Sequence, residues 1–255
     1  MTVLPSQRLD GRHALVTGGG RGIGRACALA LAEAGATVSL MARSPDELEA
    51  VAEAIDQGGG RAEAIVGDVR SHEDVERAVA AASGSGELSI CVNAAGTNRP
   101  GPIEQLSLED LDLMLDVNVR GTFLVCRSFG ARLRRDGRPG RIVNISSQMG
   151  EVGYPGRVAY CTTKHAVNGL TRALAVEWAP HGIAVNAVAP TFVRTPLTAP
   201  MLADSDFRAE VERRIPLGRV GEVEEVVGAV VFLASDQATL VTGHVLAVDG
   251  GWTSW

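Results

Sequence analysis

Lysine is almost absent from this chain of 255 residues: Lys164 is the only one, and the other 23 basic residues are arginine. Cysteine is scarce too. The four cysteines follow no Cys-x-x-Cys or zinc-ligand spacing, which predicts reduced thiols rather than disulfides or a zinc site. The five histidines show no ligand spacing either. We therefore expect no metal site, and the single lysine requires an explanation of its own.

Long apolar runs and an excess of basic charge are also missing. No apolar stretch is long enough to span a bilayer, and the amino-terminal segment lacks the cationic region and cleavage-like site of a secretion signal. We therefore expect a cytoplasmic protein. With 30 acidic against 24 basic residues, the chain as a whole has no electrostatic attraction to phosphate backbones or anionic membranes. Neither nucleic acid nor a membrane is expected as a partner.

Short apolar segments alternate with longer stretches of helical period along the chain. Hydrophobic residues make up 45% and charged residues 21% of the sequence, which is typical of a packed globular protein. Helices are predicted near residues 22–34, 45–55, 72–82, 108–135 and 158–178. This regular alternation predicts right-handed crossovers and an α/β fold, with a doubly wound parallel sheet between two layers of helices. No shift in composition divides the chain, so residues 1–255 are expected to form one domain.

Two local patterns refine this organisation. Ser44, Pro45 and Glu47 form a capping-box signature at the start of the second predicted helix. The stretch 191–217 breaks the alternation, because prolines bound a helix-like insertion between the last two strands. In open α/β folds, such an insertion is a candidate lid over the carboxyl ends of the strands.

A glycine-rich segment follows the first predicted strand. In "TGGGRGIG", Gly18, Gly22 and Gly24 suit a turn whose backbone passes close to a pyrophosphate, with the free N–H groups of the next helix facing the phosphates. The spacing is G-x-x-x-G-x-G rather than the commoner G-x-G-x-x-G. A purely structural tight turn is the alternative explanation for the glycines alone.

Tyr160 and Lys164 are four residues apart on a predicted helix and therefore share one face. The positive charge of lysine favours a phenolate, which lowers the pKa of tyrosine toward the working pH of a general acid or base. A compact ammonium group can also donate hydrogen bonds to the hydroxyl groups of a ligand, a role that suits a planar guanidinium less well. This is a chemical reason to keep one lysine in a chain that otherwise uses arginine.

Five motifs in order resemble those of the short-chain dehydrogenase/reductase family: "TGGGRGIG", "NAAG" at 93–96, Asn118 in "LDVNVRG", Ser147 in "NISSQMG", and the Tyr160-x-x-x-Lys164 pair. The resemblance extends from about Leu9 to Gly251. It implies a single Rossmann domain with a seven-stranded parallel sheet, assembled as a homotetramer. It also implies reversible hydride transfer between nicotinamide and a carbonyl or secondary alcohol carbon.

The resemblance gives the reacting residues separate roles. Tyr160 moves the proton, Lys164 supports it, and Ser147 binds the substrate oxygen as charge develops on it. Ser146 is the competing assignment, although family spacing favours Ser147. Asn118 supports a water molecule that relays protons to the lysine, and a polar residue that merely bends its helix is the alternative.

The resemblance also assigns the cofactor contacts. They are Gly18, Arg21, Gly22, Ile23, Gly24, Arg43, Asp68, Val69, Asn93, Ala94, Gly96, Tyr160, Lys164, Pro190, Thr191, Val193 and Thr195. Ala42 occupies the position where an acidic residue would bind the ribose hydroxyls of NAD. Because Arg43 follows it and Arg21 lies in the glycine turn, two guanidinium groups can hold a 2′-phosphate, which favours NADP over NAD. Thr191 departs from the family, which usually has glycine there.

The substrate side is less specific. Asn98 and Arg99 follow the fourth strand, where a guanidinium can hold a carboxylate or a polyhydroxylated group, and Gln148 and Tyr154 can add polar contacts. Together with Ser147 and Tyr160, which contact the substrate oxygen, this set resembles that of gluconate, sugar-acid and polyol dehydrogenases within the family. The expected partner is therefore a small polar substrate.

Two other functions remain open. The runner-up is a 3-oxoacyl-[acyl-carrier-protein] reductase, for which Arg134, Arg135 and Arg138 could contact an acidic carrier, although His181 occupies the second position that is usually basic. A regulatory protein that senses NADP without catalysis is the third. It is disfavoured because the four reacting residues Asn118, Ser147, Tyr160 and Lys164 are all present.

Overall fold

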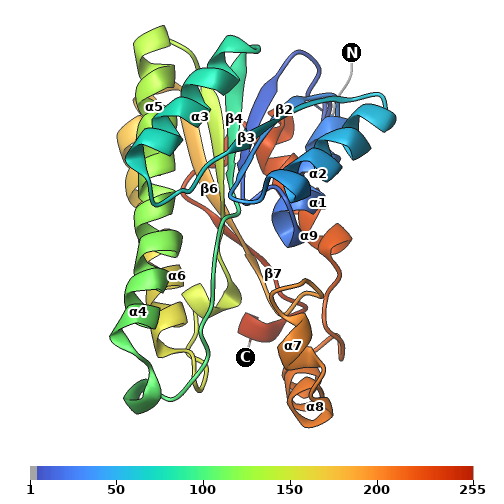
Figure 1. Ribbon diagram of the computed structural model, residues 1–255, viewed down its shortest axis with the longest axis vertical. Coiled ribbons are helices and arrows are strands. Elements are labelled where there is room, and N and C mark those ends of the chain that lie inside the picture. Colours follow the sequence, from blue (N-terminus) through green and yellow to red (C-terminus); the bar gives the residue numbers. More distant parts are fainter. Residues whose placement is uncertain (1–4, 255) are drawn as a thin grey trace.

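A parallel sheet of seven strands forms the centre of the computed structural model, which describes residues 5–254 (Figure 1). The strands are β1 (His13–Thr17), β2 (Thr37–Ala42), β3 (Arg61–Val66), β4 (Leu88–Asn93), β5 (Gly140–Ile145), β6 (Ile183–Pro190) and β7 (Val245–Val248). Their order in the sheet is β3-β2-β1-β4-β5-β6-β7, and all neighbours are parallel. The order reverses between β1 and β4, which creates a crevice at the carboxyl ends of the strands. The predicted fold class is confirmed.

Helices cover both faces of the sheet. One layer contains α1 (Gly22–Glu33), α2 (Pro45–Gln57) and α9 (Val223–Ala234); the other contains α3 (His72–Gly84), α4 (Leu108–Met114), α5 (Thr122–Asp136) and α6 (Val158–Trp178). Short 3₁₀ segments are η1 (Ile103–Gln105), η3 (Gln148–Gly150), η4 (Ala179–His181), η5 (Asp236–Ala238) and η6 (Trp252–Ser254). Each layer packs on its own cluster of buried apolar side chains. Because both faces are covered, every residue of β1 and β6 is buried, as the apolar runs predicted.

The helix predicted over 108–135 is not continuous. A π-helical segment, η2 (Leu115–Gly121), separates α4 from α5, and Asn118 lies inside it. Such one-residue insertions into a helix are rare and often mark functional sites. The capping box predicted at Ser44 is wrong, because the Ser44 side chain caps no N–H of α2. Glu47 instead points toward Arg21 in the glycine turn, with 3.7 Å between the carboxylate and guanidinium atoms.

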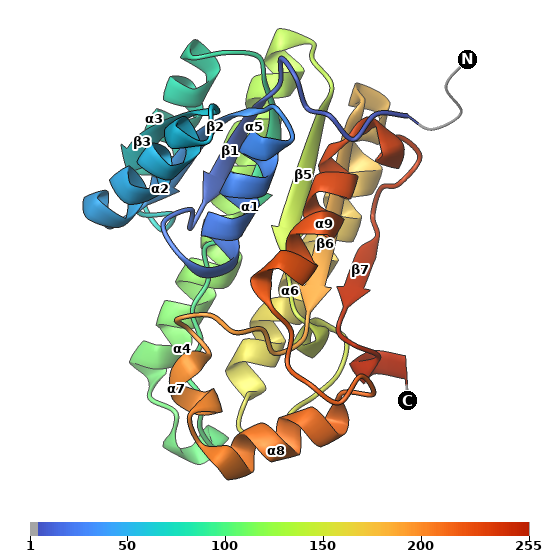
Figure 2. The same cartoon turned by 90° about the vertical axis from the view of Figure 1, so that its right-hand side faces the viewer.

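Two short helices of the insertion, α7 (Ala199–Leu202) and α8 (Ser205–Arg214), lie beyond the carboxyl ends of β6 and β7 (Figure 2). They pack with the carboxyl-terminal segment around a third apolar cluster, which includes Phe192, Leu202 and Trp252. Within residues 5–254, no helix is both long and apolar enough to cross a membrane. The amino-terminal stretch used for the cytoplasmic prediction begins in residues 1–4, which lie outside the described residues.

Candidate active site

The glycine turn between β1 and α1 leaves room for close approach of a ligand to the backbone. Gly18 and Gly22 have φ values of 67° and 56°, which only glycine adopts without strain. A Cβ added at Gly24 would lie 2.2 Å from the carbonyl oxygen of Gly18. At the start of α1, Arg21 provides no side-chain cap, so the first N–H groups of the helix are free for an anion. The turn therefore fits a dinucleotide phosphate.

A cleft of about 490 Å³ runs from this turn along the carboxyl ends of the strands. Among the residues with a predicted cofactor role, all except Asn93 line it. Asn93 lies deeper, where its amide donates a hydrogen bond of 2.9 Å to the Asn144 side chain and so links β4 to β5. Apart from Asn93, the residues predicted to contact the cofactor thus lie on one continuous surface.

One end of the cleft is rich in charged side chains. Arg21, Arg43, Glu47 and Asp68 all line it. Burial opposes ionisation of Asp68, but hydrogen bonds from the Arg70 side chain, at 2.6 and 2.9 Å, outweigh it and lower the pKa of Asp68. Asp68 is consequently an anion and a strong acceptor at neutral pH. Two guanidinium groups face a single cleft here, as a bound phosphate would require.

The other end of the cleft brings Ser147, Tyr160 and Lys164 together. The ammonium group of Lys164 donates a hydrogen bond of 2.8 Å to the carbonyl oxygen of Ile145 and lies 5.6 Å from the centre of the Tyr160 ring. Burial lowers the pKa of Lys164 to about 8, because desolvation disfavours the charged form. Lys164 remains the cation of this end of the cleft at neutral pH.

Tyr160 differs from the expectation drawn from the sequence. Burial raises the pKa of Tyr160 to about 12, and the nearby Ser147 hydroxyl offsets only part of this effect. The predicted lowering by Lys164 is not found, because desolvation of the phenol dominates the pKa of Tyr160. In the protein without ligand, Tyr160 therefore carries its proton throughout the neutral range.

The two neighbouring serines have different partners. Ser147 donates a hydrogen bond of 2.7 Å to the Gln148 side chain and accepts one from the Met149 N–H. Ser146 donates a hydrogen bond of 2.6 Å to the side chain of Asn168 on α6. Both serines line the cleft, but the Ser146 hydroxyl is held by a helix of the scaffold. This supports the choice of Ser147 as the substrate-facing hydroxyl.

Asn118 lies behind the cleft rather than on its surface. Its amide donates hydrogen bonds to the Thr97 carbonyl oxygen at 2.9 Å and the Thr163 hydroxyl at 3.1 Å, and its oxygen accepts one from the Thr97 N–H at 2.8 Å. Within the π-helical segment, this side chain faces Thr97, in the segment that follows β4. Asn118 thereby joins η2 to α6 and to the segment that follows β4.

The predicted substrate contacts are only partly brought together. Arg99 lines the cleft and pairs with Asp110 at 3.2 Å. Asn98 and Gln148 do not line it, and Gln148 is engaged by Ser147. Tyr154 does not line it either, because its ring is buried in the third apolar cluster and its hydroxyl donates a hydrogen bond of 2.9 Å to Glu210 on α8. The structure thus corrects the expected cleft position of Tyr154, which instead ties α8 to the loop before α6.

Thr191, where the family usually has glycine, also lines the cleft. Its hydroxyl oxygen is buried and has no hydrogen-bond partner within residues 5–254. A buried hydroxyl without a partner is unfavourable unless a ligand supplies one. The side chain therefore fits a polar group bound beside Pro190 and Val193.

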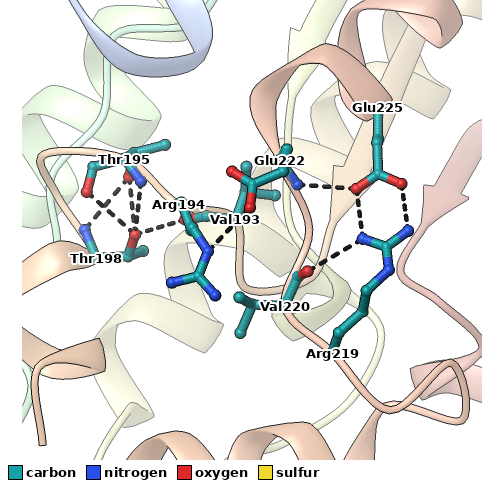
Figure 3. A network of polar contacts seen from close by, with 8 residues as sticks. All are labelled: Val193, Arg194, Thr195, Thr198, Arg219, Val220, Glu222 and Glu225. Atoms are coloured by element: carbon teal, nitrogen blue, oxygen red, sulfur yellow. Dashed lines mark hydrogen bonds and ion pairs between the residues drawn. The ribbon is translucent and has the colours of Figure 1, made fainter.

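The insertion is fastened at its stems (Figure 3). Gly221 exchanges backbone hydrogen bonds of 2.9 Å with Phe192 and Arg194, and the Arg194 side chain pairs with Glu222 at 2.9 Å. The Thr198 hydroxyl donates to the carbonyl oxygen of Val193. The residues between these stems are therefore held as a loop whose ends are joined to one another next to the cleft.

The family model described as enoyl-(acyl carrier protein) reductase matches residues 18–253. This match includes the glycine turn, the reacting residues and the insertion in one collinear alignment. The chain belongs to the short-chain dehydrogenase/reductase family. It is an oxidoreductase of that family, as the five motifs predicted.

Relatives of this short-chain dehydrogenase/reductase align along almost their full length. Gluconate 5-dehydrogenase of Gluconobacter oxydans is 40% identical over 246 residues, covering 96% of each chain. Galactitol 2-dehydrogenase of Rhizobium johnstonii is 43% identical over 253 residues, covering 97% of each. A crystal structure of a gluconate 5-dehydrogenase from Burkholderia cenocepacia, in complex with NADP and tartrate, is 37% identical, with a TM-score of 0.95 and 100% of both chains covered.

Sequence reasoning overlooked two side chains of this short-chain dehydrogenase/reductase. Glu47 was interpreted only as part of a cap, although it lines the cleft beside Arg21. Arg157 was not singled out, although its guanidinium is buried one turn before Tyr160. Its spacing of three residues from Tyr160 is a signal that could have drawn attention to it. No comparable signal in the sequence marks Glu47.

Proposed function

We propose that this oxidoreductase transfers hydride between NADP(H) and a secondary alcohol or carbonyl carbon of a small polar substrate: a sugar acid, sugar or polyol. The observation that carries the proposal is the single cleft with Arg21 and Arg43 at one end and Ser147, Tyr160 and Lys164 at the other. The relatives described as gluconate and galactitol dehydrogenases support the substrate class. The relative crystallised with NADP supports the cofactor.

The chain's own residues would handle the proton. NADPH, when bound, supplies the hydride. As the carbonyl carbon gains the hydride, its oxygen gains negative charge, which the Ser147 hydroxyl stabilises as a hydrogen-bond donor. Tyr160, whose pKa of about 12 keeps it protonated, gives its proton to that oxygen. The Lys164 cation then favours the phenolate that remains, and the reverse sequence oxidises an alcohol.

The cofactor preference rests on Arg43 and Arg21. The Arg43→Ala variant is expected to weaken NADPH binding about 30-fold, which corresponds to one charge-assisted hydrogen-bonded pair of about 2 kcal/mol. Affinity for NADH should change less than about threefold, because NADH has no 2′-phosphate to contact. Fluorescence titration of the reduced cofactors measures both.

Arg61→Ala, an exposed residue of β3 outside the cleft, is the matched control and should leave both affinities unchanged. Unchanged NADPH affinity in Arg43→Ala, or tighter binding of NADH than NADPH by the parent protein, would contradict the choice of NADP.

A panel of substrates tests the proposed reaction. Gluconate, glucitol and an acetoacetyl thioester are assayed with NADP(H) and NAD(H) by the change in nicotinamide absorbance. We expect turnover of the sugar acid or the polyol with the NADP form, because Ser147, Tyr160 and Lys164 make the reacting end of the cleft polar. Turnover of the thioester alone would overturn the substrate class and leave the oxidoreductase assignment intact.

The runner-up is 3-oxoacyl-[acyl-carrier-protein] reductase, and a relative of that description from Aquifex aeolicus, 41% identical over 246 residues, supports it. Its proposed docking residues argue against it. Arg134 and Arg135 lie in the last turn of α5 and Arg138 follows it, while His181 lies in η4. These elements directly precede β5 and β6, so the residues lie at the amino ends of the strands, away from the cleft. An NADP-sensing regulator, the third candidate, would bind NADPH but turn over no substrate in the panel.

We also propose that the chain is one cytoplasmic Rossmann domain that assembles as a homotetramer. Large apolar side chains on its surface support assembly, since Val176 is 80% exposed and Leu240 is 98% exposed. Light scattering on the purified protein tests this. We further propose that residues 191–217 act as a substrate lid, which their position beyond the strand ends and their fastened stems support.

A further inference from the structure

Arg157 is a buried charge with few partners. It immediately precedes α6 and is only 6% exposed. One guanidinium nitrogen donates a hydrogen bond of 3.0 Å to the carbonyl oxygen of Gly156, and another contacts the sulfur of Met201 at 3.1 Å. The third nitrogen, Nε, is buried and has no partner within the described chain. A thioether sulfur is a weak acceptor, so two of the three nitrogens are poorly satisfied.

The guanidinium also has no counter-charge. It forms no ion pair with any residue of 5–254, and the aromatic rings of Tyr154 and Phe207 lie against it, each with its centre 5.9 Å away. The Glu210 carboxylate of α8 is already engaged, because it pairs with Arg214 at 2.8 Å and accepts the Tyr154 hydroxyl. Burial consequently lowers the pKa of Arg157, although guanidinium remains charged at any physiological pH.

An uncompensated buried cation is costly to the folded state. Buried charges in proteins are normally paired, and leaving one unpaired is strongly destabilising. By contrast, Arg99, the residue expected from the sequence to hold a substrate carboxylate, is paired with Asp110 and has a side chain that is 47% exposed. Of these two arginines, Arg157 is the one whose charge still lacks an anion.

Arg157 does not itself line the cleft, but it lies behind residues that do. It is one turn before Tyr160, close enough for the two groups to affect each other's pKa, and its partner Met201 belongs to α7, which follows the cleft-lining turn at 195–198. A small shift of the flexible Met201 side chain frees one edge of the guanidinium, which presents two parallel N–H groups that match a carboxylate. The apolar walls provided by Tyr154 and Phe207 would strengthen that pair by excluding water.

We propose that Arg157 binds the carboxylate of a sugar-acid substrate, so that the cleft prefers the acid to the polyol with the same carbon skeleton. This proposal rests on the proposed function and specifies its substrate class. The substrate carboxylate would then lie at Arg157, on the side of Tyr160 that faces residues 191–217, and the reacting carbon would lie between the carboxylate and Tyr160.

The test replaces Arg157 by methionine, which keeps an unbranched, flexible apolar side chain and removes the charge. With NADP, kcat/KM for gluconate is expected to fall about 100-fold, while kcat/KM for glucitol, which has a hydroxymethyl group in place of the carboxylate, changes less than about threefold. Arg172→Met is the matched control on α6, the helix that Arg157 precedes; Arg172 is exposed and pairs with Glu151, and its replacement should change neither value.

Equal losses for gluconate and glucitol would show that Arg157 only supports the fold, and unchanged values for both would show that it does not contact substrate; either result overturns the proposal. If Arg157→Met does not fold, Arg157→Lys replaces it. That variant keeps the charge but loses the paired N–H groups, so kcat/KM should fall about tenfold for gluconate and stay unchanged for glucitol. Equal losses of kcat/KM for both substrates would again overturn the proposal.

A binding measurement separates this proposal from the proposed reaction. Calorimetry on the protein loaded with NADP compares tartrate with threitol, the polyol of the same skeleton. Tartrate should bind more tightly to the parent protein, and the advantage should disappear in Arg157→Met. Loss of that advantage without turnover of any substrate would refute the reaction but keep the carboxylate site. Turnover by the parent protein, together with an unchanged preference of Arg157→Met for tartrate, would support the reaction and refute the carboxylate site.

Discussion

The Lys164→Met variant is expected to be more stable than the parent protein and almost inactive. At pH 7, its free energy of unfolding should rise by about 2 kcal/mol. Burial lowers the pKa of Lys164 from 10.5 to about 8, which destabilises the folded state by about 3 kcal/mol. The variant avoids this cost but loses the hydrogen bond to Ile145, which stabilises the folded state by about 1 kcal/mol. Turnover should fall by about 1,000-fold or more, because the cation that supports the Tyr160 phenolate is gone.

The stability difference should depend on pH in a defined direction. Because the pKa of Lys164 is lower in the folded than in the unfolded chain, the unfolded chain binds more protons between about pH 8 and 10.5. The penalty from Lys164 is complete below pH 8 and disappears as the pH rises through this window. Urea unfolding at pH 7, 8.5 and 9.5 should therefore show a shrinking advantage of Lys164→Met. An advantage that stays constant across these values would contradict the assigned cause.

Lys164→Arg separates charge from shape. It keeps a cation on α6 but replaces the compact ammonium by a broad guanidinium, so folding should be preserved while turnover still falls by orders of magnitude. Full activity in this variant would remove the explanation for the single lysine of the chain. Arg172→Met, on the exposed face of the same helix, should affect neither stability nor turnover strongly.

The second large effect is expected from Gly24→Ala. The new Cβ would lie 2.2 Å from the Gly18 carbonyl oxygen, and Gly18 is itself packed against the backbone of Ala94 and Ala95, so neither segment can move away freely. We expect a loss of about 3 kcal/mol in unfolding free energy and at least about 100-fold weaker NADPH binding, since the turn that faces the phosphates must shift. Denaturant unfolding and fluorescence titration measure the two effects.

Gly228→Ala is the matched control for this clash. Gly228 lies inside α9, is exposed, and has open space where its Cβ would be. Alanine is a better helix former than glycine, so this variant should gain about 0.5–1 kcal/mol and bind NADPH normally. Normal NADPH binding by Gly24→Ala as well would mean that the turn does not cradle the cofactor.

The parts of the fold that repeat a simple pattern could be predicted from the sequence. The apolar runs located the sheet because its strands are covered on both faces, and the spacing of Tyr160 and Lys164 placed both on one side of α6. The π-helical segment at Asn118 could not be found this way, since a single extra residue in a helix hardly changes a hydrophobic period. Tertiary contacts overrode local signals elsewhere.

Glu47 illustrates such an override. Its local sequence favours a cap, but the glycine turn brings Arg21 within 3.7 Å, a contact that no short window of sequence contains. Tyr154 and the pKa of Tyr160 were misjudged for a similar reason, because both depend on elements distant in the chain that bury them. Arg157 was the hardest to predict from the sequence. It stands out only because no acidic side chain of the elements packed around it pairs with its guanidinium group.

The joined stems of the insertion allow its sequence to vary independently of the cleft residues next to it. Because Gly221 is bonded to Phe192 and Arg194, the segment between them leaves and re-enters the domain at almost the same point. Its length and composition can therefore diverge while Pro190 and Thr191, on the sheet side of the stems, keep their positions. If this segment forms the proposed substrate lid, exchanging it should change substrate choice while the residues of the reacting end stay in place.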